Sequence, residues 1–208
     1  MSHAVAMFPL GSVLVPGMPL PLHLFEPRYL AMLDVVLQSE PAHFGVVLIE
    51  RGHEVGGGEV RFDVGTLAQV EQVEKAAGRA VLIARGTRRF AVDRWLPDDP
   101  FPRADLTEVA EPHWHESLRP SLQRAEDSIR RDLARASEYV ELMWGPETVL
   151  SDDPVERCWQ LLGICIAGPL DQVRLLRCDD LEQLLAEVVE LSAAALETVT
   201  FGRSDDGF

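Results

Sequence analysis

Apolar residues in the second half of the chain recur every three or four positions, which is the spacing of one helix face. The pattern predicts helices over residues 117–143, 154–167 and 170–177, and a last helix that begins near Leu181. Asp152 or Asp153 is expected to cap the second helix, and Asp179 or Asp180 the last. Four helices with acidic outer faces indicate a compact bundle. The stripe of the first helix consists of Leu118, Leu122, Ile129, Leu133, Ala136, Val140 and Met143.

The first half of the chain either alternates or forms short apolar runs, and both patterns indicate strands. Strands are expected over residues 44–49, 60–64, 66–74, 79–85, 88–95 and 104–109. Gly65 is expected to permit a bend, Gly86 to permit a turn, and Ala77-Gly78 to form a turn. Val81 and Ile83 should share one face. Five or more short strands separated by glycine favour a small, mostly antiparallel barrel or sandwich.

The stretch from Phe8 to Tyr29 contains four prolines between apolar residues, at positions 9, 16, 19 and 21. We expect a short strand at residues 13–15, then a kinked extended run to Leu24, and then a largely buried helix from Pro27 to about Gln38. Glu26 then lies at or just before the N-cap, where a carboxylate can accept hydrogen bonds from free amides.

Several motifs in a fixed order give the chain a family resemblance. The opening run FPLGSVLVPGMPLPLHLFEPRY is similar to the start of the Lon-protease N-terminal, or substrate-binding, domain. FGVVLI at 44–49, DVGTLA at 63–68, RGTRRF at 85–90 and the helical tail around 171–176 and 181–196 resemble later parts of the same family. The resemblance implies an α+β fold, in which a PUA-like β pseudo-barrel with one inserted helix (residues 1–112) precedes an α-helical bundle (residues 113–208). Together the two lobes would form one Lon N-terminal-like domain.

Charge and composition narrow the classes of partner. The formal net charge is −15, which argues against general binding of nucleic acid or anionic membranes. No apolar stretch is long enough to span a bilayer, and no signal peptide is evident, so a cytoplasmic location is expected. The three cysteines, Cys158, Cys165 and Cys178, are expected to be free thiols, the first two on one helix face and buried.

Catalytic motifs are not found. The triple glycine at 56–58 is followed by Glu59 rather than by the Lys-Ser/Thr of a phosphate-binding loop, and Lys75 is the only lysine in the chain. A Ser–Lys dyad needs a lysine with a lowered pKa, but glutamates at 71 and 74 would keep Lys75 charged. No enzyme activity and no cofactor are therefore expected. His113, His115 and Glu116 are the best metal candidates, although a solvated junction is the simpler interpretation.

Two groups of residues are candidates for binding. Arg79, Arg85, Arg88, Arg89 and Arg94 would form a basic strip that captures acidic client groups or RNA phosphates, or else pair with the surplus carboxylates. In the opening run, Met18 and Leu20 would line a tolerant apolar groove, while Glu26, Arg28 and Tyr29 would either cap the helix or contact the ligand. The candidate binding residues are Met18, Leu20, Glu26, Arg28, Tyr29, Arg88, Arg89 and Phe90.

The function implied by the resemblance is that of a non-catalytic module that binds exposed or unfolded segments of client polypeptides, with a protease or ATPase as its partner. A client strand added to a barrel edge is one mode of recognition. RNA binding through the arginine strip and a small hydrolase with an unrecognised site are the alternatives.

Overall fold

The structure is a computed structural model that describes residues 4–52 and 60–201, and the chain divides into two units, Met1–Glu111 and Pro112–Phe208. The triple glycine at 56–58 and residues 202–208 lie outside the described residues. The class is α+β, as predicted: among the described residues, unit 1 holds a six-stranded sheet and one α-helix, and unit 2 holds four α-helices.

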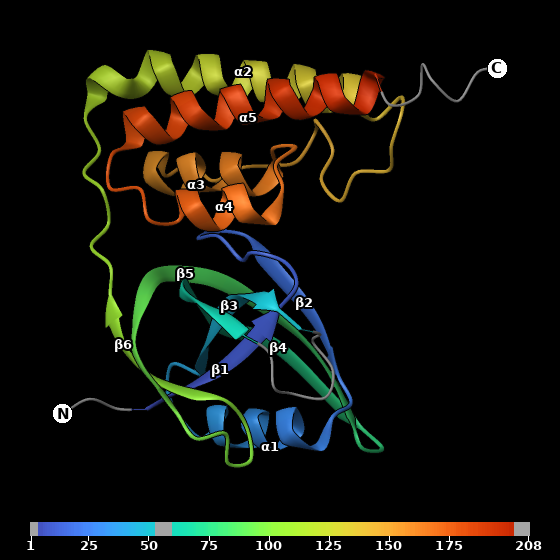
Figure 1. Ribbon diagram of the computed structural model, residues 1–208, viewed down its shortest axis with the longest axis vertical. Helices are drawn as coiled ribbons and strands as arrows, with labels where there is room; N and C mark the ends of the chain where they lie inside the picture. The colour runs from blue at the N-terminus through green and yellow to red at the C-terminus, as the bar shows by residue number, and fades with distance from the viewer. Residues whose placement is uncertain (1–3, 53–59, 202–208) are drawn as a thin grey trace. The chain divides into compact units, whose positions relative to one another are not determined.

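The strand pairings of unit 1 close on themselves (Figure 1). The order is β2-β5-β4-β3-β1-β6, and β6 also pairs with the second half of β5. Five strands thus form a ring, with β2 as an extra strand on the first half of β5. All the pairs are antiparallel except β1 with β3, which are parallel. The strands are β1 (Val5–Leu10), β2 (Pro19–Leu24), β3 (His43–Arg51), β4 (Val60–Ala76), β5 (Arg79–Leu96) and β6 (Arg103–Glu108).

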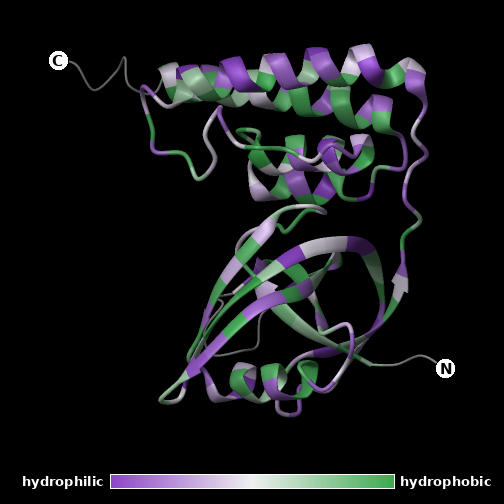
Figure 2. Cartoon of the chain, turned by 180° about the vertical axis from the view of Figure 1, so that it is seen from behind, coloured by the Kyte–Doolittle hydropathy of each residue, from purple (hydrophilic) through white to green (hydrophobic). Residues whose placement is uncertain are grey.

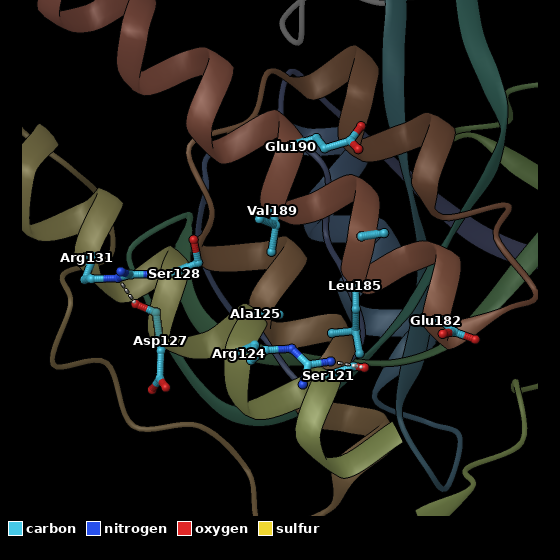
Figure 3. Close-up of a pocket in the computed structure, with 11 residues that line it drawn as sticks. Ser121, Arg124, Ala125, Asp127, Ser128, Arg131, Glu182, Leu185, Val189 and Glu190 are labelled. Atoms are coloured by element: carbon cyan, nitrogen blue, oxygen red, sulfur yellow. Dashed lines mark hydrogen bonds between the residues drawn. The ribbon is translucent and has the colours of Figure 1, made fainter. Parts of the chain in front are cut away.

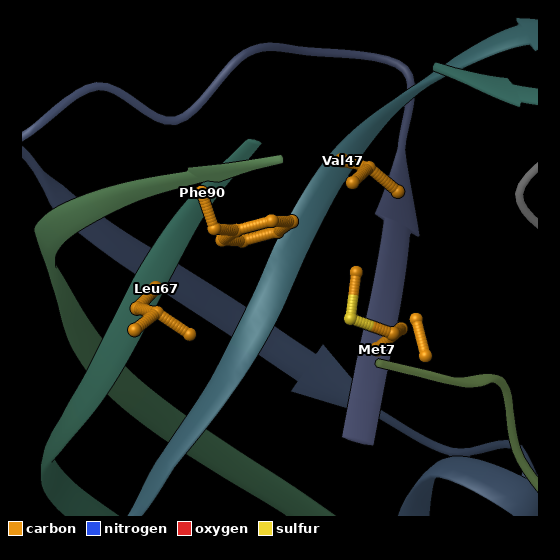
Figure 4. Packing of buried hydrophobic residues seen from close by; sticks show 5 residues of the cluster. Met7, Val47, Leu67 and Phe90 are labelled. Carbon is orange, nitrogen blue, oxygen red and sulfur yellow. The ribbon is translucent and has the colours of Figure 1, made fainter. Parts of the chain in front are cut away.

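Unit 1 has apolar packing on both sides of its sheet. Met7, Val47, Leu67, Phe90 and Ala104 form one buried cluster (Figure 4). On β1 the neighbouring Phe8 packs instead against Tyr29 of helix α1 (Pro27–Val36), with the ring centres 4.3 Å apart. Since successive residues of a strand face opposite sides, β1 contributes to both groups.

Gly65 and Gly86, expected at a bend and at a turn, both lie inside continuous strands. β4 runs through Gly65 and β5 runs through Gly86. A Cβ at Gly65 would lie 2.0 Å from the Val46 carbonyl oxygen, and one at Gly86 would lie 2.3 Å from the Val15 carbonyl oxygen. These glycines therefore allow close backbone approach, and at Gly86 the β4–β5 ladder also shifts register. The one hairpin turn predicted correctly is at Ala77-Gly78, where both residues have positive φ.

The opening run forms β-strands at its two ends and none in its middle. The strand expected at residues 13–15 is absent, whereas β1 precedes it and the proline-rich β2 follows it. Leu14 and Val15 are buried without a ladder, and the Leu14 carbonyl accepts a hydrogen bond from Thr66 Oγ1 at 2.6 Å. The predicted helix after Pro27 is confirmed as α1. Glu26 occupies its N-cap, but its side chain makes no capping hydrogen bond.

Unit 2 contains helices α2 (Arg119–Ala136), α3 (Pro154–Ile164), α4 (Pro169–Leu175) and α5 (Leu181–Phe201), with a short 3-10 turn at Glu116–Leu118. Helices α2 and α5 lie side by side (Figure 1), and polar and apolar residues alternate along both (Figure 2). Asp153 caps α3 by accepting from the Glu156 amide at 2.8 Å. Asp180 Oδ1 accepts from the amides of Glu182 and Gln183 at 2.7 and 3.0 Å, so both expected caps form.

Helix α2 ends seven residues earlier than its apolar pattern predicted. Val140 and Met143, expected in the buried stripe, are 40% and 86% exposed. The guanidinium of Arg130 donates hydrogen bonds to the carbonyls of Pro146 and Thr148, which hold the returning chain against α2. A continued helix would displace this return. Within the described residues, no helix is long and apolar enough to cross a membrane.

Candidate functional site

The structure divides the predicted binding residues by burial. Met18, Tyr29, Arg89 and Phe90 are buried, with Arg89 and Phe90 completely so. Phe90 belongs to the core cluster beside Met7 and serves packing. Leu20 is half-buried on β2, whereas Glu26 and Arg28 are partly exposed and Arg88 is exposed. These residues therefore do not form one continuous surface.

Within the described part of unit 1, four of the five arginines of β5, all except Arg79, lie near carboxylates. Arg85 pairs with Glu71 at 2.6 Å, Arg88 with Glu108 at 2.5 Å, and Arg94 with Asp105 at 2.6 Å. Arg89 is buried and lies 3.7 Å from the Glu111 carboxylate. The sequence left two interpretations of this run open. These contacts match the one in which the arginines pair with carboxylates of the same chain. Because Arg88 and Arg89 are adjacent on a strand, they also face opposite sides.

On one side of the paired strands β2 and β5, apolar side chains are exposed to solvent. Pro21 is the direct partner of Ile83, and Pro19 lies two residues away on the same face. Val81 and Ile83 are 43% and 37% exposed, while Leu22 and Leu82, which pair on the opposite face, are buried. We call Pro19, Pro21, Val81 and Ile83 the outer apolar face. Val81 and Ile83 share a face as expected, but that face is the one turned to solvent.

A small cavity adjoins this face, between the neighbouring ends of β1 and β2. Its volume is about 190 Å³, and we call it the edge pocket. Its buried lining consists of Phe8, Pro9, Leu10, Leu22, Leu24 and Tyr29, and its more exposed lining of Pro21, His23, Phe25 and Glu26. Phe25 is 58% exposed, which is unusual for a phenylalanine. The pocket joins Glu26 and Tyr29, two of the sequence-predicted residues.

Glu26, Arg28 and Tyr29 form one contact group beside the edge pocket. Arg28 Nε donates to Glu26 Oε2 at 3.1 Å, and the guanidinium carbon lies 4.4 Å from the centre of the Tyr29 ring. Stacking and the ion pair together orient the arginine. Arg28, rather than the amides of the helix, therefore orients the Glu26 carboxylate. The Glu26 side chain lines the pocket and is 18% exposed.

The strand edges at the pocket are poor in hydrogen-bond donors. Met18 accepts from the Gly86 amide, so the even-numbered residues of β2 make the ladder to β5. Pro19, Pro21 and His23 therefore turn their backbone groups away from β5, and only His23 brings an N–H. On β1, the Met7 amide points away from β3 to the Pro102 carbonyl, and Pro9 follows on that same side without an N–H.

Strand addition at this edge, the mode expected from the sequence, therefore lacks most of the donors that a ladder requires. Proline on an edge strand is a common protection against such pairing. The available chemistry is side-chain contact with the outer apolar face and with the edge pocket. Sequence reasoning missed Phe25, Val81 and Ile83. The signal was present in the two β2 prolines, which mark an edge strand, and in Ala80 and Ala84, whose small side chains take the inner face.

A second cavity, of about 780 Å³, lies between α2 and α5 (Figure 3). Arg124 and Arg131 line it from α2, and Glu182 and Glu190 line it from α5. Arg124 donates to Ser121 Oγ at 3.0 Å, and Arg131 Nε donates to the Asp127 carbonyl at 3.1 Å. Its floor is made of buried Ala125 and Leu185. It presents charged side chains of both signs around this apolar floor.

In the described parts of the chain, no group of side chains is assembled for binding a metal ion, and the two buried thiols are protonated. No three His, Cys, Asp or Glu side chains lie close enough there to hold a metal ion. Glu116, the proposed third ligand, instead accepts hydrogen bonds from Trp114 Nε1 and Arg119 Nε, at 2.9 and 2.8 Å. Burial raises the pKa of the Cys158 and Cys165 thiols to about 12, so neither is a thiolate at neutral pH.

Comparisons with known proteins agree with this architecture. The sequence matches the ATP-dependent protease La (LON) substrate-binding domain over residues 4–193. One similar solved structure is a Lon N-terminal domain protein from Xanthomonas campestris, with 23% identity and a TM-score of 0.64 over 90% of this chain and 98% of that one. Another is the N-terminal domain of Mycobacterium avium complex Lon protease, with 18% identity and a TM-score of 0.64 over 92% and 98%. At these identities the two structures support the fold. The family match spans both units, and we conclude that this chain belongs to the Lon substrate-binding domain family.

Proposed function

We propose that this chain is a non-catalytic recognition module that binds exposed or unfolded segments of client proteins through the outer apolar face and the edge pocket. The observation that carries the proposal is the outer apolar face itself, where Val81 and Ile83 remain 43% and 37% exposed beside two prolines. Exposed apolar surface of this kind marks interaction sites. Membership of a substrate-binding family supports the same role, and a protease or ATPase is the partner that the family suggests.

The proposal also assigns an architecture to each of the two units. We regard unit 1 as a PUA-like pseudo-barrel and unit 2 as a helical bundle, together one Lon N-terminal-like domain. The ring of strand pairings supports the first, and the contacts of α2 with α3 and α5 support the second. Rigid strands then carry the binding face, which suits a surface that meets clients of varied sequence through non-directional contacts.

Fluorescence anisotropy with a labelled, permanently unfolded polypeptide tests the function. Val81→Asp and Ile83→Asp place a charge on the outer apolar face, and each should weaken binding about tenfold or more. Val149→Asp is the matched control, because Val149 is 90% exposed and lies in unit 2. Unchanged binding by both unit 1 variants, with circular dichroism confirming their folds, would refute the proposed surface.

A further inference from the structure

The edge pocket has the size of a subsite for one side chain. Its volume, about 190 Å³, is below the roughly 300–1,000 Å³ typical of small-molecule sites. Phe8, Leu10, Leu22 and Leu24 supply apolar lining, and all four are more than nine-tenths buried. A single long side chain could lie along this lining from an entrance beside exposed Phe25.

The polar groups at the pocket are mostly acceptors. Pro21 and His23 turn their carbonyls away from β5, where His23 also brings one N–H and Pro21 brings none. The Glu26 carboxylate adds two acceptor oxygens: Oε2 is bonded to Arg28, which offsets the charge, and Oε1 lies outside that hydrogen bond. The site thus combines apolar walls with oxygen acceptors at one end.

We propose that the edge pocket accepts one long basic side chain, lysine or arginine, from an extended client segment. The inference rests on the proposed function, since it names which residue of a client enters the pocket. The methylenes of such a side chain lie against Leu22 and Leu24, while its cationic head reaches the carbonyls and Glu26. Lysine and arginine routinely bury their stems against apolar surface while keeping the head in a polar setting.

The excess of acceptors favours this occupant over an acidic or purely apolar one. Hydrogen bonds from a cation to a carboxylate are among the stronger ones in proteins. A glutamate side chain would meet carbonyl oxygens and Glu26 with no donor of its own. The formal charge of −15 further raises the local concentration of basic segments.

Three otherwise identical extended apolar peptides test the inference by fluorescence anisotropy. They carry lysine, norleucine or glutamate at one central position, so that lysine and norleucine share the same stem. We expect wild-type protein to bind the lysine peptide about tenfold more tightly than the norleucine peptide, and the glutamate peptide most weakly. Glu26→Gln should reduce the lysine preference to below about twofold. Glu50→Gln, an exposed glutamate on β3, should leave that preference intact.

A second measurement needs no substitution. In methyl spectra of the wild-type protein, the lysine peptide should shift the resonances of Leu22 and Leu24. Equal affinity for the lysine and norleucine peptides, or shifts confined to residues remote from the pocket, would overturn the pocket assignment while leaving the proposed function standing. Failure of all three peptides to bind would overturn both.

Discussion

Arg88 and Arg89 are neighbours on β5, yet their side chains have opposite environments. Arg88 is 58% exposed and pairs with Glu108, whereas Arg89 is fully buried and donates through Nη2 to the Ala110 carbonyl at 2.7 Å. The buried guanidinium ties the end of unit 1 to the sheet. Replacing each arginine in turn therefore compares the stability contributed by a buried arginine with that contributed by an exposed one.

Replacing Arg89 with alanine should destabilise the fold, because it removes a buried hydrogen-bonding group and leaves a cavity. We expect a loss of about 2–4 kcal/mol in the free energy of unfolding for Arg89→Ala. Arg88→Ala should change it by less than about 1 kcal/mol, since exposed ion pairs contribute little. Urea denaturation measures both. Similar effects from the two variants would contradict the assignment of these roles.

Gly65 should tolerate no side chain. A Cβ there would lie 2.0 Å from the Val46 carbonyl oxygen, so Gly65→Ala must push β4 away from β3. We expect a loss of about 3 kcal/mol or more, or failure to fold. Gly145→Ala is the control, because no heavy atom lies within 4 Å of its Cβ position. Thermal unfolding of the two proteins distinguishes them, and equal melting temperatures would disprove the close-approach explanation.

The contribution of the α3 cap, Asp153, to stability can be distinguished from that of the adjacent charged residue, Asp152. Asp153 accepts from the Glu156 amide, while the adjacent Asp152 makes only a 3.4 Å contact with Arg157. Asp153→Ala should cost about 1 kcal/mol in the free energy of unfolding. Asp152→Ala should cost less than about 0.5 kcal/mol. If chemical denaturation reversed this order, Asp152 would be the functional cap.

Alkaline pH should weaken the fold through the buried thiols. In the folded chain burial raises the pKa of Cys158 and Cys165 from 9.0 to about 12, so the folded state holds these protons after the unfolded state has released them. Their contribution to stability is full below pH 9 and is lost as pH rises towards 12. Unfolding free energies measured between pH 8 and 11 should fall more steeply in wild type than in Cys158→Ala/Cys165→Ala. Parallel slopes would show that the thiols do not contribute.

The periodic patterns predicted element type better than element limits. Stripes of leucine and valine located α5, and Asp153 and Asp180 marked real helix starts, because caps act locally. The end of α2 was not predictable from its stripe, since the hydrogen bonds of Arg130 to Pro146 and Thr148 are tertiary contacts. Gly65 and Gly86 were misjudged for a similar reason: close backbone approach and a bend both call for glycine.

The candidate site shows the same limit. The sequence indicated the opening run, and Glu26 and Tyr29 do line the edge pocket. The outer apolar face was missed because the run 80–84 is apolar throughout, so no polar residue marks the side that is turned to solvent. Nor could residue types alone reveal that Arg89 is inside the unit and Arg88 outside it.

The position of β1 in the ring has a consequence for how the protein is made. Val5 pairs with Ala104, and Met7 pairs with Gly45, so β1 is synthesised before both of the strands it pairs with and must await them. Contacts this distant along the chain slow folding, because the intervening chain must be ordered first. Until β6 emerges, β1 and the apolar residues of β5 stay available for incorrect pairing. The nascent recognition module is therefore itself, for a time, an unfolded segment of the kind it is proposed to bind.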